Sequence, residues 1–116
     1  MRGLFFPLAT FIASCTAGNG AVGFQQFTVP DSGSKPLAVA VWYPSDSAAV
    51  SQAIGPFRQT VAVDGRISGE RFRLILTSHG SQGSLASHYD TAVALAQEGF
   101  VVAALTHTGD NTTDQT

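Results

Sequence analysis

Residues 72–105 read FRLILTSHGSQGSLASHYDTAVALAQEGFVVAAL, and this stretch decides the fold class that the sequence predicts. It contains two apolar runs, at residues 72–78 and 100–105, with the continuous apolar character of strands buried on both faces. Residues 84–98 between them show helical spacing, and Gly99 stands where a left-handed residue commonly ends a helix. The order strand, helix, strand predicts a βαβ unit with parallel strands and a right-handed crossover.

The predicted helix is expected to bury one apolar stripe. Ser87 and Asp90 have the S-x-x-D form of a capping box, which indicates that the first regular turn begins there. The stripe consists of Leu85, Tyr89, Ala92, Val93 and Ala96.

Two further strands are predicted before this unit. Residues 23–29 are rich in aromatic and β-branched side chains and end at Pro30, and residues 37–44 form a nearly continuous apolar run. The short connection between them is rich in turn residues, which predicts an antiparallel hairpin. We expect Trp42 and Tyr43 to pack this hairpin against the core.

The predicted fold class is α/β, an antiparallel hairpin followed by the βαβ unit. Gly and Pro punctuate residues 45–69, so we expect an irregular excursion there with one short strand at residues 59–64. No strand or helix is predicted after residue 105. One amphipathic helix leaves one face of the sheet, and one edge, without cover. We therefore expect residues 22–116 to be the N-terminal portion of a larger domain, with self-association through the exposed sheet edge as a further expectation.

The composition excludes two classes of protein. With 44% hydrophobic and 12% charged residues, the 116-residue chain is not a charge-rich disordered protein. The net charge of −2 and the single lysine, Lys35, leave no basic stripe, so nucleic acid is not expected as a partner. The one cysteine, Cys15, allows neither an intrachain disulfide nor a cysteine cluster for zinc.

Residues 1–21 are interpreted as a leader segment and are excluded from the fold prediction. The apolar run at residues 4–13 is far shorter than the ~20 residues that span a bilayer, but it fits the apolar region of a secretory signal. The sequence IASC at residues 12–15 also resembles a bacterial lipoprotein signal, in which Cys15 would be lipidated and would attach the protein to a membrane. We expect an exported protein, periplasmic, extracellular or lipid-anchored. The alternative is a flexible cytoplasmic leader or a misassigned start of the sequence.

The central motif, SHGSQG at residues 78–83, allows three interpretations. In the first, Ser81 is a nucleophile between a strand and a helix, as in Gly-x-Ser-x-Gly. His79 is too bulky for the first glycine position of that sharp turn. The order nucleophile, acid, histidine is also not met, because Asp110 follows His107.

In the second interpretation the motif is an oxyanion-hole loop, which supplies backbone N–H groups to a developing negative charge. Gly80 and Gly83 let the backbone turn tightly, and the N-terminus of the following helix favours an anion. His79 would pack and hydrogen-bond beneath the loop without transferring a proton. In the third interpretation the segment is an ordinary turn, with Ser84 or Ser87 capping the helix.

The three histidines do not suggest a metal site. No acidic or cysteine ligands share a compact spacing with His79, His88 and His107, so no metal is expected. We expect His88 to be exposed near the start of the helix and His107 to form hydrogen bonds within a loop.

The chain resembles bacterial α/β-hydrolases of the platelet-activating factor acetylhydrolase and dienelactone hydrolase-like group. The resemblance is carried by GF…F.VPD…KPL.V.VWYP at residues 23–44, SHGSQGS at residues 78–84 and LAQEGFVVAALTHTGDN at residues 95–111. It extends over nearly everything after residue 22.

The resemblance implies that SHGSQG is the oxyanion loop and that Ser81 donates its backbone N–H to the tetrahedral intermediate. THTGDN would line the mouth of the active site, with Thr108 where the family often has proline. The implied substrates are small-molecule or lipid esters, and no cofactor is implied. The candidate substrate-binding residues are His79, Gly80, Gln82 and Gly83.

The resemblance also implies a nucleophile elbow on the strand after Leu105, yet Gly-x-Ser-x-Gly does not occur in these 116 residues. We therefore predict a truncated member of a serine carboxylic-ester hydrolase family that is inactive alone. The alternative is a non-catalytic exported module for binding or assembly.

Overall fold

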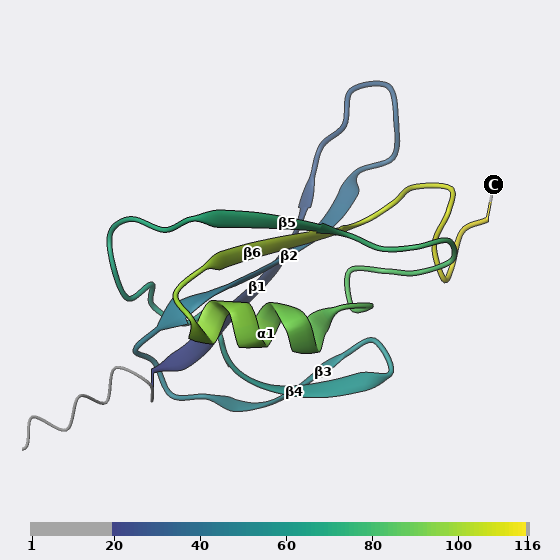
Figure 1. The fold of residues 1–116 in the computed structure, drawn as a ribbon. Coiled ribbons are helices and arrows are strands. Elements are labelled where there is room, and N and C mark those ends of the chain that lie inside the picture. The colour runs from purple at the N-terminus through teal and green to yellow at the C-terminus, as the bar shows by residue number, and fades with distance from the viewer. Residues whose placement is uncertain (1–19, 116) are drawn as a thin grey trace, which may run out of the picture.

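The computed structural model describes residues 20–115, which form six strands and one helix. Figure 1 shows one mixed sheet with the strand order β3-β4-β1-β2-β6-β5 and the helix α1 beside it. The predicted leader, apart from residues 20 and 21, and its lipidation site Cys15 lie outside the described residues. The elements are β1 (Ala21–Val29), β2 (Leu37–Ser45), β3 (Val50–Ile54), β4 (Phe57–Val63), β5 (Leu74–Ser78), α1 (Tyr89–Gln97) and β6 (Val101–Thr106).

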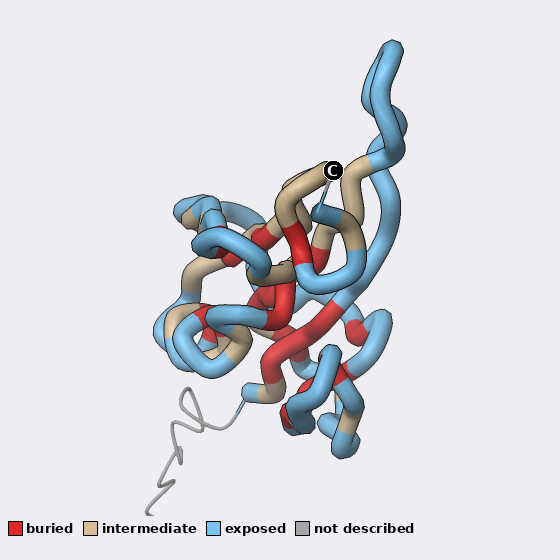
Figure 2. The backbone as a smooth tube through the Cα atoms, turned by 90° about the vertical axis from the view of Figure 1, so that its right-hand side faces the viewer, coloured by how far each residue is buried: buried red, intermediate tan, exposed pale blue. Residues whose placement is uncertain are grey.

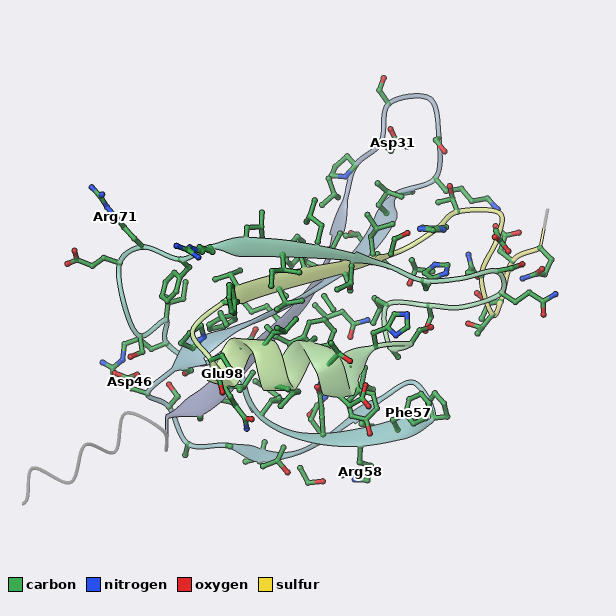
Figure 3. The ribbon with its side chains drawn as sticks, in the orientation of Figure 1. Asp31, Asp46, Phe57, Arg58, Arg71 and Glu98 are labelled. Carbon is green, nitrogen blue, oxygen red and sulfur yellow. The ribbon has the colours of Figure 1, made fainter. Side chains whose placement is uncertain are left out.

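The predicted antiparallel hairpin is confirmed: β1 and β2 pair from Ala21↔Ser45 to Val29↔Leu37. Trp42 is fully buried, and its ring stacks on Phe24 at 5.1 Å between centroids. Tyr43 is 3% exposed and donates from its hydroxyl to the backbone oxygen of Gly65 at 2.7 Å. The hairpin therefore packs against the core through the two aromatic residues that the sequence indicated. Its far end, around Asp31, projects from the body and is exposed (Figure 3).

The strand predicted at residues 59–64 is confirmed as β4, but the expectation of irregular structure in the rest of residues 45–69 was wrong, because β3 precedes it. β3 and β4 form a hairpin with the register Val50↔Val61 to Ile54↔Phe57, and β4 joins the sheet by parallel pairing with β1. Gly55 has a φ of +53°, so the tight turn falls at the glycine and proline that suggested irregular structure. β3 escaped detection because only Ile54 on it is buried, which leaves its sequence weakly apolar.

The predicted βαβ unit is confirmed. β5 and β6 pair in parallel, and β6 in turn pairs antiparallel with β2. The helix buries Ala92 and Ala96 and contacts β1, β2 and β6. The ring of Tyr89 at its start stacks on that of Phe57, with 5.1 Å between the centroids. Gly99 follows the helix with a φ of +101°, as its position indicated.

The start of the helix differs from the prediction, because residues 84–88 form turns and α1 begins at Tyr89. The capping box is absent: His88 is the N-cap and makes no side-chain capping bond. The Ser87 hydroxyl accepts from the Ser84 N–H at 2.9 Å, and Asp90 accepts from the Thr91 N–H. Local turn bonds thus use the two side chains that the capping box required.

The expectation that the strand at residues 72–78 is buried on both faces was also wrong. Leu74 and Leu76 are 61% and 72% exposed, whereas Ile75 between them packs against the core. β5 lies at the edge of the sheet, and α1 covers the face on which Ile75 lies. The buried residues gather in the middle of the molecule, as Figure 2 shows. An uncovered face and edge among the described residues agree with the sequence prediction.

Candidate functional site

The candidate site lies in the segment that connects β5 to α1. The first residue of this segment, His79, is 6% exposed. Nε2 of His79 accepts the backbone N–H of His107 at 2.8 Å, so this nitrogen carries no proton. Nδ1 therefore carries the proton and donates to the backbone oxygen of Gly80 at 2.7 Å. Both ring nitrogens of His79 are thus occupied in holding backbone groups.

The turn itself runs from Gly80 to Gly83, closed by the Gly83 N–H to Gly80 oxygen bond of 3.0 Å. Of its two central residues only Gln82 has a positive φ, +62°, which is the pattern of a type II turn. A Cβ at Gly83 would lie 2.8 Å from Cβ of His79 and 2.8 Å from the Ser87 hydroxyl. Gly83 is required by this close approach, whereas the space beside Gly80 is open.

Ser81 is exposed at the first central position of the turn. Its hydroxyl donates to Oδ1 of Asp110 at 3.3 Å, and the Gln82 N–H donates to the same oxygen at 3.0 Å. The backbone N–H of Ser81 has no hydrogen-bond partner among residues 20–115. One backbone donor of the turn therefore lacks a partner within residues 20–115, and the next is occupied by a carboxylate.

The loop after β6 is bonded to this turn along its length. The Leu85 N–H donates to the Thr106 hydroxyl at 2.9 Å, and the Thr112 N–H donates to the Gly83 oxygen at 3.1 Å. The Ser78 hydroxyl lies 2.8 Å from Nε2 of His107. The ring of His107 also packs on that of His79, with centroids 3.9 Å apart. These contacts bring together two segments that the sequence separates by about one helix and one strand.

Asn111 holds that second loop in shape. It is 6% exposed, and its Nδ2 donates to the backbone oxygen of His107 at 2.7 Å. Its Oδ1 accepts the backbone N–H groups of Thr113 and Asp114 at 2.9 and 2.8 Å. From the sequence, Thr106, Asp110 and Asn111 were expected only as part of THTGDN at the mouth of the active site, with Asp110 also considered as the acid of a triad; their hydrogen bonds to the turn were not foreseen. The signal available was the cluster of turn-forming residues directly after an apolar strand.

The hydroxyl of Ser81 contacts a carboxylate and no histidine, which does not favour the interpretation of Ser81 as a nucleophile. His88 is exposed, as expected, and takes no part in the cluster. Within residues 20–115 no group of three His, Cys, Asp or Glu side chains could hold a metal ion.

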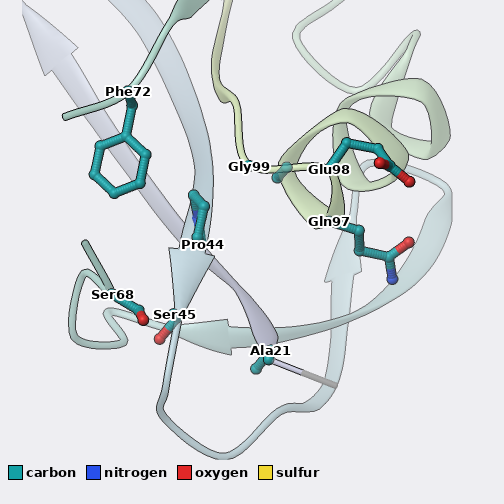
Figure 4. A pocket seen from close by; sticks show the side chains of 10 residues that line it. Ala21, Pro44, Ser45, Ser68, Phe72, Gln97, Glu98 and Gly99 are labelled. Atoms are coloured by element: carbon teal, nitrogen blue, oxygen red, sulfur yellow. The ribbon is translucent and has the colours of Figure 1, made fainter. Parts of the chain in front are cut away.

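The hollow drawn in Figure 4, of about 370 Å³, lies at the other end of the sheet. Pro44 and Ser45 at the end of β2, Phe72, and Gly99 after α1 contribute to its wall. It contains neither the turn nor the second loop, so it is separate from the candidate site. No helix in the described part of the chain is both long and apolar enough to cross a membrane.

Neither a family model nor a curated protein matches the sequence. Among solved structures, the chain is similar to a ferulic acid esterase from Streptomyces cinnamoneus, with 20% identity and a TM-score of 0.70. The similarity covers 78% of this chain and 34% of the esterase, so the chain spans about a third of that protein's length. The described residues therefore have a fold similar to part of that structure, which agrees with the predicted α/β class.

Proposed function

We propose that residues 22–116 are the N-terminal portion of a serine carboxylic-ester hydrolase and supply its oxyanion loop. The observation that carries the proposal is that the backbone N–H of Ser81 has no hydrogen-bond partner within residues 20–115. It lies on a turn between the edge strand β5 and the helix α1, and both His79 and Asp110 hold that turn. The esterase fold of the similar structure supports the same function.

The proposed chemistry uses the backbone of the turn. When a nucleophile attacks an ester, the carbonyl oxygen becomes negative, and a positioned N–H stabilises that charge in the transition state. Loss of one such donor typically costs about 3 kcal/mol of activation free energy. Ser81 supplies the donor, and Gly80, Gln82 and Gly83 shape the surface on which the ester lies. His79 supports this surface through its hydrogen bond to the backbone oxygen of Gly80.

The nucleophile, acid and base are proposed to be encoded beyond residue 116. No Gly-x-Ser-x-Gly occurs in the sequence, so the 116-residue chain is expected to be inactive alone. The substrates proposed are small-molecule or lipid esters, and a feruloyl ester is one of them because the similar structure is a ferulic acid esterase. No metal or organic cofactor takes part in the proposed reaction. Residues 1–21 are proposed to direct export, with Cys15 as the lipidation site of a membrane-attached form.

The first experiment is an assay of the 116-residue chain with p-nitrophenyl acetate, a short-chain phospholipid ester and methyl ferulate. We expect no turnover above buffer. Turnover that a serine-directed inhibitor abolishes would contradict the division of the active site proposed here.

The second experiment translates the DNA downstream of codon 116 in the three forward frames. A continuation with Gly-x-Ser-x-Gly supports the proposal, and the continuous chain can then be assayed with the same esters. Ser81→Ala keeps the backbone N–H and should leave most of the activity. Loss comparable to that of removing the nucleophile would refute the role given to Ser81.

The second candidate function is a non-catalytic exported module for binding or assembly, favoured by the exposed Leu74 and Leu76 on the edge strand. Unrelated sequence downstream, together with cooperative melting of a soluble 116-residue product, would support it. Sedimentation would then show whether the chain associates with itself.

A further inference from the structure

Asp110 lies in the loop after β6 and reaches across to the turn that follows β5. Its Oδ1 accepts two hydrogen bonds from this turn, one from the Gln82 N–H at 3.0 Å and one from the Ser81 hydroxyl at 3.3 Å. We infer that Asp110 is a positioning residue, which holds the turn in the conformation that keeps the Ser81 N–H available to an oxyanion. The inference rests on the function proposed above and names the side chain that organises the loop.

The turn needs such support because of the conformation of Gln82. Its φ of +62° is left-handed, which is disfavoured for a residue with a Cβ, and the corresponding position of a type II turn is normally glycine or asparagine. In a type I turn the peptide between Ser81 and Gln82 would be flipped, and the Gln82 N–H would point elsewhere. Only the observed orientation places that N–H on the carboxylate, and a bond to an ionised acceptor is stronger than a neutral one.

Asp110 is itself held in place on both sides. Asn111, the next residue, bonds to the His107 oxygen through Nδ2 and to two further backbone N–H groups through Oδ1. The Thr112 N–H donates to the Gly83 oxygen at 3.1 Å. The backbone that carries the Asp110 carboxylate is therefore fixed by hydrogen bonds of the residues that follow it.

The same carboxylate brings a negative charge near a loop proposed to stabilise an oxyanion, and the two effects oppose each other. Asp110→Asn separates them, because asparagine keeps an oxygen acceptor and removes the charge. Asp110→Ala removes both. If the hydrogen bonds accepted by residue 110 matter more than its charge, asparagine should preserve the conformation of the turn and alanine should not.

The first test uses the 116-residue chain and measures backbone amide hydrogen exchange and ¹H–¹⁵N shifts by NMR. In Asp110→Ala, exchange at Gln82 should rise roughly tenfold or more, since the amide loses a bond to a charged acceptor. The amide shifts of Ser81 and Gln82 should move. Asp110→Asn should lie closer to the parent. Asp90→Ala is the matched control, because that carboxylate accepts a local bond from Thr91 and lies on the helix.

Unchanged exchange and shifts at Gln82 in Asp110→Ala would overturn the inference. So would equal effects of the alanine and asparagine variants. A general loosening is recognised because Asp110→Ala would then also speed exchange at β6 amides, and that result too would count against a specific positioning role.

The second test measures kcat and KM of the continuous, ester-hydrolysing chain. Asp110→Ala should lower kcat roughly 10- to 100-fold with little change in KM, and Asp110→Asn should recover most of the loss. An increase of kcat in either variant would overturn the inference, since it would mean that the charge opposes catalysis more than the bond supports it. If the continuous chain hydrolyses no ester, the proposed function fails. The exchange at Gln82 still decides whether Asp110 positions the turn.

Discussion

The backbone N–H of His107 donates a 2.8 Å hydrogen bond to Nε2 of His79, and this bond joins the ends of two adjacent parallel strands. His79 follows β5 and His107 follows β6, so the bond can form only when the two strands pair in their observed register, with Ser78 opposite Leu105. The ring of His79 accepts one backbone hydrogen bond and donates another, and it thereby stabilises the conformation of the loop.

His79→Phe should destabilise the fold. Phenylalanine keeps a ring in the buried position but leaves the His107 N–H and the Gly80 oxygen without their partner, which costs about 1–3 kcal/mol of unfolding free energy. Urea unfolding would measure it. His88→Phe is the control, because His88 is exposed and lacks a side-chain capping bond. Equal effects of the two variants would show that the bonds of His79 contribute nothing specific.

Gly83→Ala should destabilise the fold, because the new Cβ would lie 2.8 Å from both Cβ of His79 and the Ser87 hydroxyl. We expect a loss of about 1–3 kcal/mol of unfolding free energy, as for overpacking elsewhere. Gly80→Ala meets no atom within 4 Å and should change stability by no more than about 0.5 kcal/mol. Thermal melts of both variants would measure the difference, and a harmless Gly83→Ala would show that the turn can open.

Tyr43 should make stability fall at high pH. Burial raises the pKa of its phenol above 10.0, Asp64 raises it further, and a bond with Gln25 acts in the opposite direction. The folded state thus holds the proton more tightly than the unfolded state, so stability declines once the pH exceeds the unfolded pKa of 10.0.

Denaturant midpoints between pH 8 and pH 11 would measure this decline. Tyr43→Phe should be less stable at neutral pH by about 1 kcal/mol, since the hydroxyl bond to Gly65 is lost, but its decline at high pH should be shallower. Parallel curves for the two proteins would exclude Tyr43 as the cause.

Leu76→Thr should reduce self-association without destabilising the fold. Leu76 is 72% exposed on an edge strand, and threonine retains strand propensity while removing apolar surface. Sedimentation velocity and thermal melting would measure the two properties. Ile75→Thr is the matched control on the same strand and should lower the Tm, because Ile75 packs against the core. Unchanged self-association in Leu76→Thr would show that the exposed side chain of Leu76 on β5 does not contribute to the contact between copies.

The parts of the fold that were predictable are those in which the sequence pattern and the packing agree. The apolar runs that form β2 and β6, the end of the helix before Gly99 and the buried Trp42 all belong to this group. β3 was not predictable, because it is a mostly exposed strand that depends on β4 and its turn for its conformation. The exposure of Leu76 was not predictable either, because an apolar run does not reveal how many faces of its strand are covered.

The candidate site divides in the same way. The motif around Ser81, with its flanking glycines and histidine, was visible as a turn between a strand and a helix. Its link to Asp110 was not visible, because the carboxylate reaches the turn only after β6 has paired with β5.

By itself, the sequence determined most local elements of this protein: every strand except β3, the end of the helix before Gly99 and the turn that follows β5. Hydrophobic periodicity and glycine placement act over a few residues, so they can be read along the chain. The tertiary structure alone decided which residues support that turn. Strand pairing brings the loops around His79 and Asp110 together across the edge of the sheet, and no local pattern encodes that contact.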